Sequence, residues 1–136
     1  MKNQISWVTS LNTGVGIIDQ DHKGLFRTLN LLNLAMIEGQ SKELINRIIQ
    51  ELIEYIIEHF GHEEQLMEQY KYADSRAHID EHMKLIARVT ASTADIENGR
   101  NAVPLVLLEF LYNWLNSHIM KSDKKLAQAL LAAGFI

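Results

Sequence analysis

The sequence contains no cysteine, and this absence excludes several kinds of site at once. Disulfides, zinc sites built on thiolates, iron–sulfur clusters and cysteine nucleophiles all depend on that residue. Proline occurs only once and glycine seven times, and no segment alternates polar and apolar residues for long. Because helix breakers are this rare and strand-type alternation is missing, the chain is predicted to be all-α.

Two further absences concern partners and compartment. The formal net charge is −4 and the basic residues form no stripe, so we expect no binding to nucleic acid or to an anionic membrane. The apolar runs, such as 103–108 and 127–133, fall far short of the ~20 residues of a membrane-spanning helix. The N-terminal stretch MKNQISW has no apolar core of a secretory signal, so a cytoplasmic location is expected.

Helical periodicity runs through almost the whole length of 136 residues, which suits one domain, 1–136. We predict an N-terminal arm over 1–18 with Trp7 as its packing anchor, a bundle over about 19–120, and a tail over about 121–136. The helices are expected at about 19–38, 42–69, 76–97 and 104–120, with a short C-terminal helix at 124–133. Four long helices with short connections predict an antiparallel up-down-up-down four-helix bundle.

Residues at the expected helix ends support these boundaries. Ser41 and Ser75 are suited to cap the second and third helices. Asp19 and Asp21 suit the positive end of the first helix, and Pro104 suits the first turn of the fourth.

Five of the six histidines and one glutamate fall on faces whose residues are spaced three and four apart, the pattern that faces a bundle interior. These six residues are His22, His59, Glu63, His78, His82 and His118. One buried histidine is usually a hydrogen-bonded core residue, whereas a buried carboxylate is costly unless it is paired or binds a metal. Antiparallel packing would gather all six side chains in one layer at one end of the bundle, and such a layer favours a metal site.

The spacing of these residues also favours coordination. Two pairs are four residues apart, which puts their members about 40° apart on one helix face: His59 with Glu63, and His78 with His82. Asp123 follows His118 by five residues and would diverge from it on a continuous helix. Asp123 is therefore expected to join the site only if the fourth helix breaks at the polar stretch 121–123.

In order and spacing, these residues resemble the ligand pattern of the hemerythrin family. The pattern reads His22, His59-Phe60-Gly61-His62-Glu63-Glu64, His78-x-x-x-His82 and His118-x-x-x-x-Asp123. Trp7, Gly14 and 19–22 resemble the arm of bacterial members, and 114–119 resembles the segment before the last histidine. The resemblance covers nearly the whole chain, which looks like a stand-alone bacterial hemerythrin. Ala73 replaces a proline of many members, so a different loop before the third helix is expected.

The resemblance implies a non-haem centre of two iron ions with seven ligands: His22, His59, Glu63, His78, His82, His118 and Asp123. The two carboxylates would bridge the ions together with an oxo or hydroxo group. Three histidines would complete one ion, and His22 and His59 would leave an open position for dioxygen on the other. An apolar lining would exclude water from that position. The candidates for this lining, by helix position, are Leu25, Phe60, Trp114, Leu115 and Ile119.

The expected function is reversible dioxygen binding for storage, buffering or delivery, with no catalytic side chain and no enzyme activity. Delivery would imply an oxygen-consuming enzyme as partner. Ferritin-like di-iron enzymes use Glu-x-x-His pairs, and this sequence contains none. An oxygen or redox sensor and a di-iron enzyme acting on peroxide or nitric oxide remain alternatives, because all three use the same irons. His62 is expected off the ligand face, as a surface residue or a support for a ligand.

Overall fold

The computed structural model describes residues 9–98 and 103–135, and every regular element in that part of the chain is helical. The elements, in order, are η1 (Thr9–Leu11), α1 (Gly16–Ile37), α2 (Lys42–Gln69), α3 (Ser75–Glu97), α4 (Val103–His118), η2 (Ile119–Asp123) and α5 (Lys124–Ala132). The predicted all-α class is confirmed. None of the described helices is long and apolar enough to cross a membrane.

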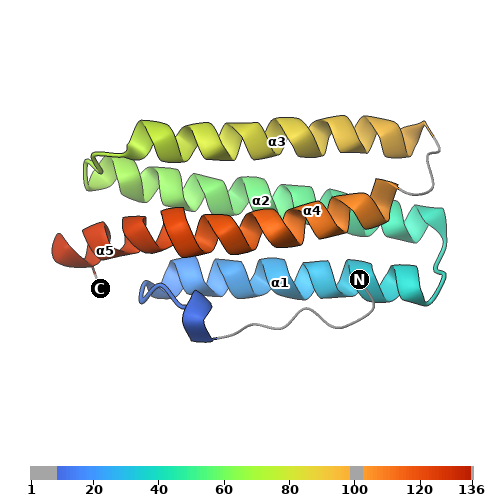
Figure 1. Cartoon of the computed structure of the whole chain (residues 1–136), viewed down its shortest axis with the longest axis horizontal. Helices are drawn as coiled ribbons and strands as arrows, with labels where there is room; N and C mark the ends of the chain where they lie inside the picture. Colours follow the sequence, from blue (N-terminus) through green and yellow to red (C-terminus); the bar gives the residue numbers. More distant parts are fainter. Residues whose placement is uncertain (1–8, 99–102, 136) are drawn as a thin grey trace.

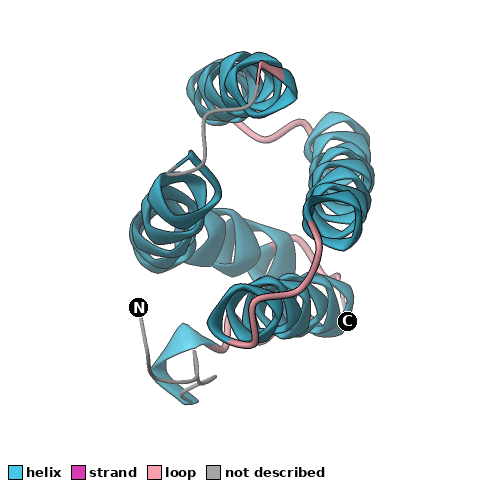
Figure 2. Cartoon of the chain, turned by 90° about the vertical axis from the view of Figure 1, so that its right-hand side faces the viewer, coloured by secondary structure: helices cyan, strands magenta, loops and turns pink. Residues whose placement is uncertain are grey.

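The four long helices lie side by side, and each runs antiparallel to the one before it in the chain (Figure 1). Seen along the bundle, they surround a common axis (Figure 2). Helix α1 contacts α2 and α4, and α3 contacts the same two helices. The start of α1, the end of α2, the start of α3 and the end of α4 therefore meet at one end of the molecule, as the predicted topology requires.

Two apolar clusters divide the interior along the bundle axis. The larger one fills the bundle and includes Leu25, Phe60 and Ile119. The smaller one closes the end of the bundle, where α5 and the start of α1 contribute buried apolar residues. Its members are Val15, Ile18, Met67, Leu126, Ala127 and Leu130. The level between the two clusters is where the histidines lie, so that level is covered by apolar side chains from above and below.

Helix α1 begins three residues earlier than predicted, and Asp19 lies in its first turn, as expected, where it has a further role. Its Oδ1 accepts hydrogen bonds from the backbone N–H and the hydroxyl of Thr13, at 2.8 and 2.7 Å, and its Oδ2 accepts one from the N–H of Gly14 at 3.2 Å. Gly14 has a φ of +92°, a conformation that glycine adopts without strain. Asp19 therefore fastens the end of the arm to the first turn of α1.

Of the two serine caps, one is confirmed and one is wrong. Ser41 Oγ accepts a hydrogen bond from the N–H of Leu44 at 3.2 Å. Ser75 is instead the first residue of α3, and its hydroxyl donates to the carbonyl of Tyr72 at 2.7 Å. That bond closes the turn between α2 and α3. Trp7, the predicted packing anchor, lies outside the described residues.

Candidate metal centre

The structure brings all seven predicted ligands together, and each of their side chains is buried. They come from every long helix and from η2: His22 on α1, His59 and Glu63 on α2, His78 and His82 on α3, His118 on α4 and Asp123 on η2. The single polar layer expected from the helix faces is therefore present.

The seven residues form two overlapping groups, and in each group the ligand atoms lie within 4.8 Å of one another. We call the first group the three-histidine site; it consists of Glu63, His78, His82, His118 and Asp123. We call the second the two-histidine site; it consists of His22, His59, Glu63 and Asp123. The layer can thus hold two metal ions that share both carboxylates.

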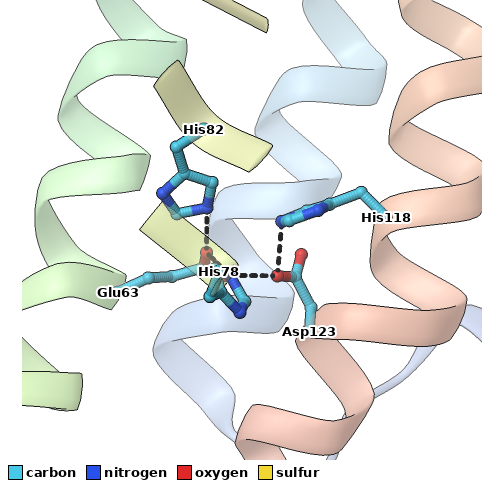
Figure 3. Close-up of side chains that lie close together, drawn as sticks. All are labelled: Glu63, His78, His82, His118 and Asp123. Carbon is cyan, nitrogen blue, oxygen red and sulfur yellow. Dashed lines mark hydrogen bonds and ion pairs between the residues drawn. The ribbon is translucent and has the colours of Figure 1, made fainter. Parts of the chain in front are cut away.

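Each shared carboxylate turns one oxygen toward each site. In the three-histidine site, Oε1 of Glu63 and Oδ1 of Asp123 face the Nε2 atoms of the histidines at 3.0–3.1 Å. Figure 3 shows these five side chains converging from α2, α3, α4 and η2. In the two-histidine site, Oδ2 of Asp123 lies 2.8 Å from Nε2 of His22, and Oε2 of Glu63 lies 3.3 Å from Nε2 of His59. This division of oxygens is what bridging between two cations requires.

Asp123 reaches the layer through a local change of helix type. Five residues of α-helix would turn Asp123 about 140° away from His118. The segment Ile119–Asp123 is instead a π-helix, in which hydrogen bonds span five residues and each residue turns less. The expectation of a break in the fourth helix is therefore wrong: the helical backbone continues, and its widened turn aims both side chains inward.

Several polar atoms of the layer are buried without a hydrogen bond. They are Oε2 of Glu63, both carboxylate oxygens of Asp123, and Nε2 of His82 and of His118. Buried polar atoms in proteins nearly always have a hydrogen-bond partner, so a cluster of orphaned ones indicates that a cation belongs there. Five imidazoles and two carboxylates suit a transition metal such as iron, and the residues present fit that group.

Charges within the layer shift the pKa values of its members. Burial lowers the pKa of His59, but the charge of Glu63, 3.3 Å away, and the hydrogen bond to Asp21 outweigh it and raise the pKa to about 10. Burial also lowers the pKa of His78, but the carboxylates of Asp123 and Glu63, each 3.1 Å from its Nε2, raise it to about 9. Burial raises the pKa of Glu63, yet the histidines around it hold that pKa well below its usual range. A metal ion would displace the protons of these buried pairs.

Sequence analysis missed three carboxylates that support the histidines from outside the layer. In each case Nδ1 of a histidine lies 2.9 Å from a carboxylate oxygen on the preceding long helix. The pairs are His59 with Asp21, His82 with Glu64, and His118 with Glu81. Such bonds fix the ring and leave Nε2 for a metal. A usable signal was present, since each of these acids is the immediate neighbour in sequence of another ligand.

The five residues predicted to line a dioxygen pocket occupy two kinds of position. Leu25, Leu115 and Ile119 are buried at 0%, 1% and 0% exposure. Phe60 stacks on the ring of His82, with centroids 3.7 Å apart, and half-buried Trp114 stacks on His118 at 4.4 Å. The aromatic pair therefore covers histidines of the three-histidine site. His62 belongs to neither site, as expected, and lies against Asp21.

Comparisons with known proteins agree with this centre. The family model described as the hemerythrin HHE cation binding domain matches residues 13–130. A bacteriohemerythrin of Pseudomonas paraeruginosa is 38% identical over 117 residues, covering 86% of this chain and 75% of that protein. One of Methylococcus capsulatus is 33% identical, covering 94% of this chain and 98% of that protein. The crystal structure of wild-type hemerythrin superposes with a TM-score of 0.87 at 31% identity, covering 94% and 98% of the two chains.

Proposed function

The chain belongs to the hemerythrin family, and we propose that it binds dioxygen reversibly at a non-haem centre of two iron ions. The observation that carries this proposal is the unequal division of imidazoles around shared carboxylates. Glu63 and Asp123 offer one oxygen to each site, whereas the histidines divide three to two. With a solvent-derived oxo or hydroxo bridge added, the two-histidine site has one ligand fewer and is where dioxygen would bind.

The surroundings of the layer support binding without further chemistry. In the part of the chain that the structure describes, every buried ionisable side chain is one of the seven proposed ligands. No other buried acid or base is then at hand to give a proton to a bound molecule. The two apolar clusters on either side exclude water. Iron ions held by the seven ligands would supply the electrons for dioxygen binding, and the protein would supply orientation and a dry environment.

We assign the lining of the dioxygen site to Leu25, Leu115 and Ile119, whereas Phe60 and Trp114 would exclude water from the neighbouring three-histidine site. Leu25 follows His22 by one turn of α1, and Leu115 precedes His118 by one turn of α4. Both leucines are buried in the larger cluster, which supports this assignment.

Storage, buffering or delivery of dioxygen is the role that fits a site of this kind. The test is to reconstitute the protein with ferrous iron, measure iron per chain, and cycle it between air and vacuum. We expect about two irons per chain, no haem absorption, and an oxygenated form that lasts for hours. Decay within seconds to minutes would favour the alternatives, a sensor or an enzyme acting on peroxide or nitric oxide. A protein that takes up one zinc ion and no iron would contradict the proposal.

A further inference from the structure

Asp21 differs from the other two supporting carboxylates because one of its oxygens serves two histidines. Oδ2 of Asp21 lies 2.9 Å from Nδ1 of His59 and 2.7 Å from Nδ1 of His62. An ionised carboxylate can only accept hydrogen bonds, so both ring nitrogens donate to it. His59 then presents its other nitrogen to the metal layer, 3.3 Å from Oε2 of Glu63. A single oxygen thus links His62 to a ligand of the two-histidine site.

His62 lies at the edge of the bundle, between the solvent and this carboxylate. Its side chain is 34% exposed, whereas that of Asp21 is 14% exposed and that of His59 is 1% exposed. The second ring nitrogen of His62 points toward Glu58, whose carboxylate is 4.0 Å away and whose side chain is 71% exposed. The bond to Asp21 is therefore the contact through which His62 reaches the interior.

We propose that His62 is a positioning residue for the metal ion of the two-histidine site and acts through Asp21 on His59. Two N–H donors on one oxygen restrain the Asp21 carboxylate more closely than one donor would, and that carboxylate sets the direction of the His59 ring. Glu81 is restrained in a comparable way, because Ser122 donates to it at 2.8 and 2.9 Å. This inference rests on the two-metal centre proposed above.

The two-histidine site depends strongly on this restraint because it has few nitrogen ligands. If the ring of His59 turns, half of the imidazoles of that site are displaced, whereas the three-histidine site keeps all of its own. Loss of His62 should therefore weaken the binding of the metal ion in the two-histidine site and leave the binding of the other ion unchanged. The effect should be smaller than the ~10–100-fold that follows loss of a group bonded directly to a ligand.

The test is the rate at which excess EDTA removes iron from the fully loaded protein. In His62→Ala we expect one of the two ions to leave roughly 3–10-fold faster than in the wild type, and the other at the wild-type rate. His62→Asn should restore the slow release, because the amide N–H₂ of asparagine takes the place of the ring Nδ1. Glu58→Gln, which removes the charge on the outer side of His62, should release both ions at the wild-type rate.

The melting temperature of the metal-free protein distinguishes this positioning role from a general contribution of His62 to the stability of the fold. We expect His62→Ala to leave that melting temperature unchanged. The proposal is wrong if His62→Ala releases both ions at the wild-type rate, or both at one faster rate, or if His62→Asn behaves like His62→Ala. An iron-loaded protein that fails to bind dioxygen would contradict the proposed function alone. The iron-release experiment would still decide the role of His62 in that protein.

Discussion

The two sites use the same two carboxylates, yet the protein surrounds their histidines differently. In the three-histidine site, Phe60 and Trp114 stack face to face on two of the rings. In the two-histidine site, the rings of His22 and His59 meet edge to face, with centroids 4.7 Å apart and planes at 75°. The three-histidine site is therefore flanked by aromatic rings and also has more ligands. The comparison indicates that the two sites differ in the packing of their histidine rings as well as in the number of histidines.

Removal of a shared carboxylate should affect both sites alike, because each of them loses a ligand. In Asp123→Ala we expect loss of most of the metal from both sites and a lower melting temperature, because metal binding contributes to folding. Metal analysis and thermal unfolding of the loaded protein check this. Asp80→Ala, which removes an exposed carboxylate from α3, is the control and should keep the wild-type metal content. Equal metal content in the two variants would show that Asp123 is no ligand.

Two single variants, each lacking one histidine of one site, should differ in metal content. His59→Ala leaves the two-histidine site with one imidazole, and we expect about one metal ion per chain. His82→Ala leaves the three-histidine site with two imidazoles and both carboxylates, the complement that its neighbour has naturally. That variant should keep close to two ions at saturating iron. Identical metal contents in the two variants would mean that the histidine count does not decide occupancy.

The lining of the open position is tested by a smaller change that touches no ligand. Leu115→Ala opens a space on the scale of one water molecule one turn before His118. Water and small anions would then reach the iron, so we expect the oxygenated form to autoxidise several-fold faster while iron content stays unchanged.

Leu32→Ala is the control for plain loss of core packing. Leu32 is fully buried on α1, more than two turns beyond His22, and both variants should lose roughly 2–5 kcal/mol of stability. Wild-type autoxidation rates in both variants would show that Leu115 is ordinary core.

The smallest expected effect concerns pH and the metal-free protein. The pKa of His59 is raised from 6.5 to about 10, and that of His78 from 6.5 to about 9, one in each site. A raised pKa in the folded state stabilises the fold fully below pH 6.5, and this stabilisation is lost as pH rises through the folded value. The melting temperature of the metal-free protein should therefore fall as the pH is raised from 6.5 to 10. In His78→Gln, the share of this fall that occurs near pH 9 should be absent. A melting temperature that rises over this interval would contradict the assignment of these ion pairs.

Much of this molecule could be predicted because helical periodicity is a local property of the chain. The spacing of apolar residues predicted α2 over its whole observed length, and Ser41 marked its start. The same periodicity placed His59 and Glu63 on the inner face with the other histidines. Residues on one face of a helix share an environment whatever their partner is, so the membership of the layer followed from sequence.

Three features were decided only when the helices packed together. Asp21, Glu64 and Glu81 are marked in the sequence only by standing next to a ligand, and each acquires its role from a histidine on the next helix. The π-helical turn before Asp123 replaces the predicted break, because a buried carboxylate among histidines offsets the poorer backbone geometry of that turn. The two oxygens of each shared carboxylate were divided between the sites by the positions of four helices. Periodicity along one helix determines which side chains face inward, whereas the direction of each atom depends on groups that the other helices bring to it.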